Sequence, residues 1–127
     1  MKRTTYSIAA ICDKAGRSVN QDNFWICPDL SAFSQTGQTT FVDSKTEIEL
    51  SEKGALFVVA DGMGGMSAGE IASQLVIDSI KQSFTTLDTQ LLDNHKAIQQ
   101  FISQSIIDAD AKIKEHAKSN PDTAGMG

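Results

Sequence analysis

The sequence predicts a single domain of the α+β class, on two observations. Its 127 residues are enough for one compact domain. Strand-like segments occupy the first half of the chain, while apolar residues recur at helical spacing in the second half. The formal net charge is −5, from 11 basic and 16 acidic side chains, and no basic cluster is present. This charge argues against nucleic acid or an anionic membrane as a direct partner.

The sequence also indicates a cellular compartment. No apolar run is long enough to span a membrane, and the N-terminus has no small-residue cleavage site, so we expect a cytoplasmic protein. Two cysteines, Cys12 and Cys27, are too few for a disulfide framework. We expect both thiols to be reduced and mostly buried, because free cysteines prefer protein interiors.

The first predicted elements are strands. Tyr6–Cys12 and Phe24–Cys27 are rich in aromatic and β-branched residues and are separated by a polar segment, so we expect two antiparallel neighbours. From Pro28 to Gly54 the composition turns polar, with short strand candidates at Thr39–Val42 and Thr46–Leu50. This stretch is expected to be an extended loop or a projecting hairpin.

A buried strand and two helices complete the prediction. Ala55–Ala60 is apolar at every position, which is typical of a strand buried on both faces. Next, Ser67-Ala68-Gly69-Glu70 fits a capping box, in which the Ser67 hydroxyl accepts from the amide of Glu70, so a helix should begin there. Apolar residues then repeat at helical spacing along a first helix, and along a second that ends at Asn120-Pro121. These residues are Ile71, Leu75, Val76, Ile80 and Phe84, followed by Ile98, Phe101, Ile102, Ile106, Ala109 and Ile113. We interpret both faces as core packing.

Two polar clusters carry the chemistry. Asp61-Gly62-Met63-Gly64-Gly65 directly follows the apolar strand, which places a carboxylate at a strand end beside a flexible turn. The second cluster runs from Gly16 to Asn23, and its Asp22 lies at the edge of another strand. If these strands are neighbours, the two carboxylates converge on one cation site. Oxygen ligands suit Mg²⁺ or Mn²⁺, and the absence of Cys/His ligand spacing argues against structural zinc.

Each of these features also has a plainer interpretation. Asn20–Asn23 and Asp61-Gly62 are both compatible with simple turns, because Asn, Asp and Gly are common turn residues. Arg17 alone is compatible with a solvated surface charge. Their order along the chain favours a functional interpretation.

In this order the residues resemble those of the metal-dependent serine/threonine protein phosphatases of type 2C, particularly the bacterial members. The matching residues are Gly16-Arg17-x-x-Asn20-Gln21-Asp22-Asn23, then 56–65, and then Ala68-Gly69-Glu70-x-Ala72-Ser73. The second motif is long and specific. The resemblance spans essentially the whole chain, and Pro28–Gly54 is its least typical part.

The resemblance implies a fold, a reaction and site residues. The fold would be part of an α-β-β-α sandwich, with antiparallel sheets covered by two long helices. Asp22 and Asp61 would be ligands of a two-metal centre of Mn²⁺ or Mg²⁺, and Gly62 would offer its backbone carbonyl to one ion. Arg17 would hold the substrate phosphate, while a water between the ions attacks phosphorus without a phosphoenzyme. Gln21 stands where many members carry Glu, a mild departure that would alter contacts around the metal.

The resemblance also implies what residues 1–127 lack. Met126-Gly127 matches a point at which the family continues into its next core strand, and the family's later aspartates are absent. We therefore expect the N-terminal portion of a single phosphatase domain, with an insertion at about 28–54, that is inactive alone. Its exposed edges should make the isolated chain oligomerise. The implied partners are a phosphorylated protein substrate and a cognate serine/threonine kinase or its targets.

Two other classes of protein stay open. A nucleotide-binding module is one, because Gly62-x-Gly64-Gly65 lies between a strand and a helix. The negative charge of Asp61 and the absence of a P-loop lysine oppose it. The other is a non-catalytic binding or scaffold protein with a phosphatase-like fold, since a fold does not guarantee chemistry. A reading frame that continues after Gly127 into a strand, with later Asp-Gly and Asp-Asn pairs, would favour the enzyme. A natural stop would favour the scaffold.

Overall fold

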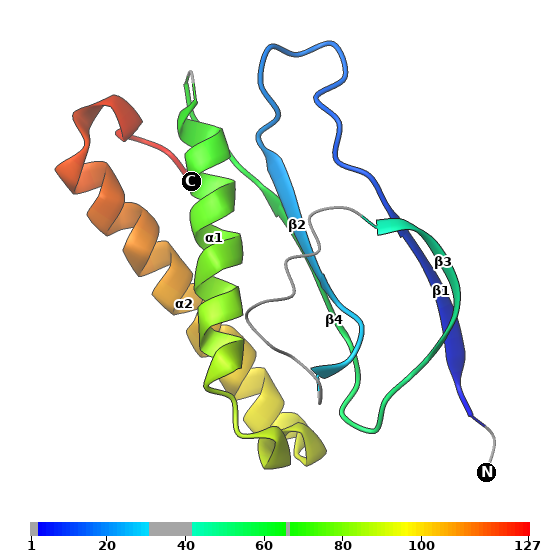
Figure 1. The fold of residues 1–127 in the computed structure, drawn as a ribbon. Coiled ribbons are helices and arrows are strands. Elements are labelled where there is room, and N and C mark those ends of the chain that lie inside the picture. The colour runs from blue at the N-terminus through cyan, green and yellow to red at the C-terminus, as the bar shows by residue number, and fades with distance from the viewer. Residues whose placement is uncertain (1–2, 31–41, 66) are drawn as a thin grey trace.

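The computed structural model describes residues 3–30, 42–65 and 67–127, and it places two long helices beside two pairs of strands (Figure 1). Within these ranges the strands are β1 (Thr5–Ala10), β2 (Asp22–Cys27), β3 (Val42–Glu49) and β4 (Leu56–Asp61). The helices are α1 (Ala68–Thr85) and α2 (His95–Ser119), with short 3-10 helices η2 (Thr89–Asp93) and η3 (Pro121–Thr123). The chain therefore has the mixed strand-and-helix composition of the predicted class.

The strands form two separate antiparallel pairs, β1 with β3 and β2 with β4. The expectation that Tyr6–Cys12 and Phe24–Cys27 are neighbours in one sheet is therefore wrong. Consecutive antiparallel neighbours are usually joined by a tight turn, whereas the long connection 11–21 separates β1 from β2 and leaves each free to pair elsewhere.

Part of the polar segment Pro28–Gly54 is a strand of the first pair. The candidate Thr46–Leu50 falls almost entirely within β3, which pairs with β1 from Thr5↔Glu49 to Ala10↔Val42. The candidate Thr39–Val42 lies mostly outside the described residues. The prediction of a strand at 46–50 is therefore confirmed. This strand pairs with β1 and not within a separate projecting hairpin.

β4 is buried on one face only, which corrects the expectation of two buried faces. Exposure alternates along it, so that Phe57 is 49% and Val59 is 80% exposed, while Val58 packs against the helices. On the outer face Tyr6 of β1 meets Phe57 edge to face, with 5.9 Å between ring centroids. Few other described side chains cover this face of β4, so its apolar residues Phe57 and Val59 remain largely exposed.

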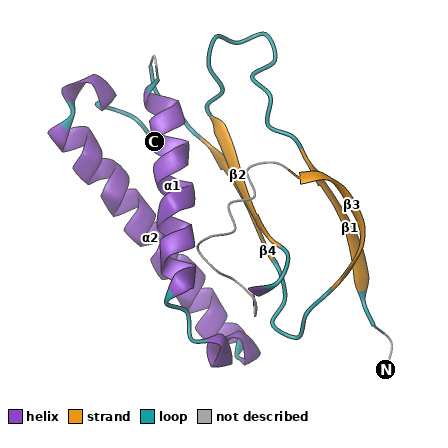
Figure 2. Cartoon of the chain, viewed as in Figure 1, coloured by secondary structure: helices purple, strands orange, loops and turns teal. Residues whose placement is uncertain are grey.

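The core lies between the β2–β4 pair and the helices, which cover one face of that sheet (Figure 2). Trp25 is only 1% exposed, and its ring meets Phe84 of α1 edge to face at 6.1 Å. Phe84 in turn meets Phe101 of α2 at 5.0 Å. Such aromatic pairs contribute beyond their buried area, so this row joins the sheet and both helices.

α1 begins where the sequence predicts, but without the predicted capping contact. Ser67 is the cap residue, yet its side chain makes no capping hydrogen bond. Its φ of −96° and ψ of 4° lie outside the extended region in which a cap side chain reaches the third amide. Instead, the amide of Ile71 donates to the Ser67 carbonyl (3.1 Å), and that of Ala68 donates to the Gly65 carbonyl (3.0 Å).

Only part of the apolar face predicted for α2 is buried. Ala109 and Ile113 are buried, and Ile113 packs with Ala68 and Ala72 of α1, whereas Ile106 remains 57% exposed. The helix ends at Ser119, directly before Asn120-Pro121 as predicted. Among the described residues, no helix combines the length and hydrophobicity needed to cross a bilayer.

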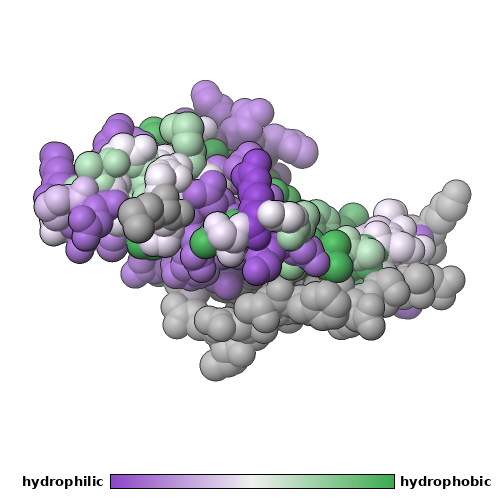
Figure 3. Space-filling model, turned by 90° about the horizontal axis from the view of Figure 1, so that it is seen from above, coloured by the Kyte–Doolittle hydropathy of each residue, from purple (hydrophilic) through white to green (hydrophobic). Residues whose placement is uncertain are grey.

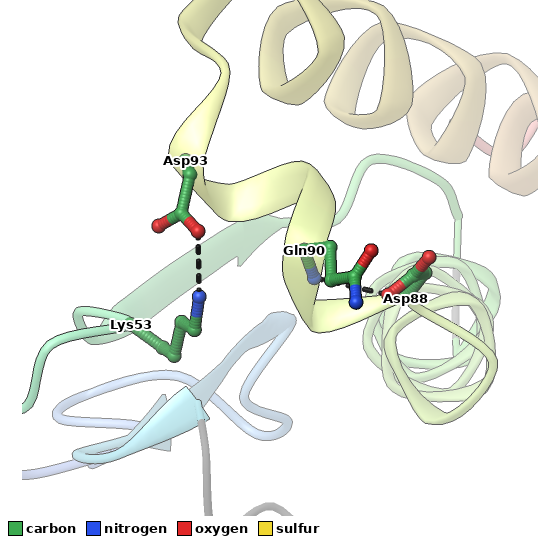
Figure 4. Close-up of polar contacts among 4 residues, drawn as sticks. All are labelled: Lys53, Asp88, Gln90 and Asp93. Carbon is green, nitrogen blue, oxygen red and sulfur yellow. Dashed lines mark hydrogen bonds and ion pairs between the residues drawn. The ribbon is translucent and has the colours of Figure 1, made fainter.

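An ion pair connects the turn before β4 to the segment between the helices. Lys53 Nζ lies 2.9 Å from the carboxylate of Asp93 in η2, and Asp88 caps the same element by accepting from the amide of Gln90 (Figure 4). The side chain of Asp93 is 70% exposed, so solvent screening holds such a pair to about 0.2–1 kcal/mol. The contact orients the connection more than it stabilises the fold.

Candidate functional site

Asp22 and Asp61 lie directly opposite each other across the β2–β4 pair. Asp22 is the first residue of β2, Asp61 is the last of β4, and the two are register partners. Directly opposed residues of an antiparallel pair share one face, with Cβ atoms about 4.5–5.5 Å apart. The two strands are therefore neighbours, which is the condition for these carboxylates to converge on one site.

The two carboxylates lie on the sheet face that points away from the helices, and both residues are exposed. None of the ion pairs among the described residues involves either of them. Like charges directly opposite each other destabilise a strand pair. A hard cation would relieve this repulsion and find two oxygen ligands on one face, so the donor set fits Mg²⁺ or Mn²⁺.

Each carboxylate also borders a hollow in the surface. Asp22, with Cys12 and Asn20, lines a cavity of about 450 Å³ beside β1, and Asp61 lines a groove of about 270 Å³ between β4 and the helices. Figure 3 shows the molecule from above the view of Figure 1, and on this side hydrophilic and hydrophobic residues lie next to one another. The aspartate pair therefore lies between two hollows rather than inside one enclosed pocket.

Gly62 brings the end of β4 into contact with the start of α1. Its N–H donates to the Gln21 carbonyl (3.0 Å), which extends the strand pairing past Asp61. Gly62 is buried, and a Cβ added to it would lie 1.8 Å from the Gly69 carbonyl oxygen. The Gly62 carbonyl oxygen in turn lies 2.9 Å from where a Cβ on Gly69 would be. The carbonyl that the resemblance assigns to a metal ion therefore packs against the helix.

Gln21 holds the glycine-rich turn with its side chain as well as its backbone. Its Nε2 donates to the Gly64 carbonyl (2.9 Å), and its side chain fills the space beside Gly69. From the sequence, Gln21 is expected only to alter contacts around a metal. The structure adds a positional role, which depends on an N–H donor that a carboxylate lacks.

We expect Gln21→Glu to destabilise the fold by about 1–3 kcal/mol in the presence of a chelator, as measured by urea unfolding. The substitution would turn a carboxylate toward the Gly64 carbonyl and add a third negative charge beside Asp22 and Asp61. Gln21→Met, which removes the hydrogen bond without adding charge, serves as the control and should cost less. Equal stability of the wild-type and Glu forms would show that the amide does not hold the turn.

Arg17 lies in the exposed loop between β1 and β2. Its backbone N–H donates to the Lys14 carbonyl (3.0 Å), which closes a turn. Within the described residues its guanidinium takes part in none of the ion pairs or side-chain hydrogen bonds. The structure therefore leaves Arg17 accessible to an external anion, but no contact brings it to the aspartate pair.

Cys12 is exposed, which corrects the expectation of two buried thiols, whereas Cys27 is buried and burial raises the pKa of its thiol. Cys12 Sγ accepts from Asn20 Nδ2 (2.9 Å) and donates to the Asp22 carbonyl (3.4 Å). Asn20 Oδ1 accepts from the Asp22 amide (3.0 Å). These bonds fix the start of β2, and sequence analysis missed them because they depend on how the loop folds back.

The described residues contain no group of three or more His, Cys, Asp or Glu side chains that could hold a metal ion. The candidate site therefore offers two carboxylates. Mg²⁺ takes six oxygen ligands, so water would complete most of its coordination sphere at this site.

The sequence is similar to those of curated bacterial proteins. It is 29% identical over 85 residues to the serine/threonine phosphatase stp of Listeria innocua, and 28% identical over 85 residues to those of Listeria monocytogenes and Listeria welshimeri. The chain resembles bacterial serine/threonine phosphatases. Each match covers 67% of this chain and 33% of the relative, so this phosphatase-like chain spans about a third of the length of the relatives. No family model matches it, and no solved structure matches it significantly.

Proposed function

We propose that the chain is part of a metal-dependent protein serine/threonine phosphatase, which hydrolyses phosphomonoesters. The observation that carries this proposal is the cross-strand pairing of Asp22 with Asp61. The names of the Listeria relatives support a phosphatase in general. Metal dependence is supported by the chemistry of the pair, because two opposed carboxylates with no cationic partner among the described residues favour a bound cation.

The proposed roles of Asp22 and Asp61 follow from where they lie, whereas those of Gly62 and Arg17 rest on the resemblance. Asp22 and Asp61 would hold Mn²⁺ or Mg²⁺, and Gly62 is proposed as a further ligand through its carbonyl. When bound, two such ions supply an acidified water and neutralise charge on the phosphoryl oxygens. Arg17, on its exposed loop, would bind the substrate phosphate through its planar guanidinium.

We further propose that the complete domain is an α-β-β-α sandwich and that residues 1–127 alone are inactive. The match to 33% of each relative supports a larger domain, and so does the uncovered outer face of β4. With two carboxylates and a carbonyl, an ion would be bound weakly and would acidify water poorly. The proposed partners are a phosphorylated protein and the kinase that acts on it.

The test is Mn²⁺-dependent hydrolysis of an aryl phosphate by residues 1–127 and by the chain extended through its natural reading frame. We expect activity in the extended protein only, lost on addition of a chelator. Asp61→Asn should lower that activity by more than the 10–100-fold typical of residues that merely support a metal ligand.

Asp108→Asn is the matched control, because Asp108 is an exposed aspartate of α2 whose side chain, within the described residues, accepts a hydrogen bond only from Gln104. It should leave the hydrolysis rate unchanged. Activity in neither chain length would contradict a catalytic function and favour the phosphatase-like scaffold. Metal-independent activity would contradict the role of the aspartate pair.

A further inference from the structure

Asp22 and Asp61 are register partners that no backbone hydrogen bond joins directly. The amide of Gly62 donates to the Gln21 carbonyl (3.0 Å), so these two residues form a hydrogen-bonded pair. Hydrogen-bonded and non-hydrogen-bonded pairs alternate along an antiparallel ladder, which makes Asp22–Asp61 the non-hydrogen-bonded pair next to it. The separation of the two carboxylates therefore depends on how the neighbouring residues of each strand are held.

The strand end that carries Asp61 is held against α1 by backbone contact. Gly62 packs so closely against Gly69 of α1 that an added Cβ would lie 1.8 Å from the Gly69 carbonyl oxygen. Both groups belong to the backbone, so a change of side-chain rotamer does not release the contact. The end of β4 therefore has little freedom to move relative to the helix.

The strand end that carries Asp22 is held against the same helix by side chains. Asn23 follows Asp22 in β2, and its side chain lies on the opposite face of the sheet, toward the helices, like that of Trp25. Asn23 Nδ2 donates to Oε1 of Gln74 in α1 (2.7 Å). Asn23 Oδ1 accepts from the Phe24 amide (2.9 Å), so both ends of the Asn23 amide are engaged.

A second hydrogen bond, within α1, fixes the orientation of the Gln74 amide. Gln74 Nε2 donates to Oδ1 of Asp78, one helical turn further along (2.9 Å). A glutamine amide has one donor end and one acceptor end, so this bond leaves Oε1 to accept from the strand. Asp78 takes part in none of the ion pairs among the described residues, so the amide does not compete with a cation for its carboxylate. Asp78 therefore acts on β2 through Gln74.

We propose that Asn23 and Gln74 form a clamp that positions Asp22 opposite Asp61 for cation binding. The inference rests on the proposed metal site and adds two positioning residues to it, which act through Asp22 and do not themselves contact the ion. α1 holds both strand ends, β4 through Gly62 and β2 through the clamp, so the helix sets the distance between the two carboxylates. Because Gln74 is exposed and a single hydrogen bond adds little net stability, the clamp should affect the position of Asp22 more than the stability of the fold.

Mn²⁺ affinity and amide exchange test the clamp in the chain extended through its natural reading frame. Gln74→Leu should weaken Mn²⁺ binding, measured by electron paramagnetic resonance, by about three- to tenfold, which is less than the loss typical of groups bonded directly to a metal ligand. With a chelator present, the Asn23 amide, which belongs to the hydrogen-bonded pair with Ala60, should also exchange faster in this variant. A contact that only stabilises the fold would lower the urea midpoint and leave the Mn²⁺ affinity of the folded protein unchanged.

Two further variants show whether the hydrogen-bond pattern is responsible. Gln104→Leu is the matched control, because Gln104 Nε2 donates to Asp108 Oδ1 in α2 (2.8 Å) and, within the described residues, this bond is not continued to a strand. It should leave the Mn²⁺ affinity unchanged. The double variant Gln74→Glu with Asp78→Asn exchanges donor and acceptor in the bond within α1, keeps the net charge and keeps an acceptor for Asn23. It should restore the wild-type affinity, whereas Gln74→Glu alone should not, because it places two carboxylates one turn apart.

Asp61→Asn separates a failure of the clamp from a failure of the metal site. If Asp61→Asn weakens Mn²⁺ binding and Gln74→Leu does not, the metal site stands and the clamp is overturned. If neither substitution changes the affinity, the metal site is contradicted, and the positioning role with it. A double variant that binds Mn²⁺ as weakly as Gln74→Leu would also overturn the clamp, because the hydrogen bonds would then not be what positions Asp22.

Discussion

Replacing Gly62 with alanine is expected to lower the free energy of unfolding by about 3 kcal/mol or more. A Cβ at this position would lie 1.8 Å from the Gly69 carbonyl oxygen and 2.8 Å from the Gln21 carbonyl oxygen. Both obstacles are backbone atoms, one in α1 and one beside β2, so neither can rotate away as a side chain would. Relief requires α1 to move from the end of β4, which disturbs the packing of buried Ala68 and Ala72.

The neighbouring glycines provide matched controls for this substitution. Gly65 has no atom within 4 Å of an added Cβ, so Gly65→Ala should change stability by less than about 0.5 kcal/mol. Gly69→Ala should be intermediate, because its added Cβ would meet side-chain atoms of Gln21 at 2.7 Å, which can shift more easily than backbone, as well as the Gly62 carbonyl oxygen. Urea unfolding measures all three variants. Equal stability of the Gly62→Ala and Gly65→Ala variants would show that Gly62 is not held between strand and helix.

Local sequence patterns were enough to locate most elements. The apolar stretch ending at Ala60 and the helical repeat ending at Phe84 correspond to β4 and α1, because strand and helix periods are properties of short segments. The stop at Asn120-Pro121 was also correct, because proline disfavours helix in the residue before it. Pairing was harder to predict. The strand that pairs with β1 is β3, and its residues lie in the polar segment that composition alone assigned to a loop or hairpin.

The aspartates of the candidate site were found because each one follows or precedes an apolar strand. The supporting contacts were not found. The bond from Gln21 to Gly64 joins segments that are far apart in sequence, and the approach of Gly62 to Gly69 depends on how the turn between them folds, so no local pattern specifies either contact. Gly62 and Gly69 are seven positions apart on either side of a turn, so two glycines that touch look the same in sequence as two that are merely flexible.

The aspartate pair is expected to reveal itself by two opposite effects of one substitution. Without metal, Asp61→Asn should stabilise the protein by about 0.5 kcal/mol, because it removes the repulsion between directly opposed carboxylates. With Mn²⁺ at 100 times its dissociation constant, the wild-type protein should gain about 2.7 kcal/mol, and the variant should lose most of that gain. Thermal unfolding with a chelator and with increasing Mn²⁺ measures both effects.

A double-mutant cycle with Asp22→Asn separates the pair from two independent surface charges. If the carboxylates repel each other, either substitution alone relieves the repulsion, so the double variant without metal should be no more stable than the single ones. Two independent charges would instead give additive changes. A wild-type protein that is not stabilised by Mn²⁺, combined with additive effects of the two substitutions, would contradict a shared cation site. Coupled effects without Mn²⁺ stabilisation would mean that the repulsion exists but that the remaining ligands must come from outside residues 1–127.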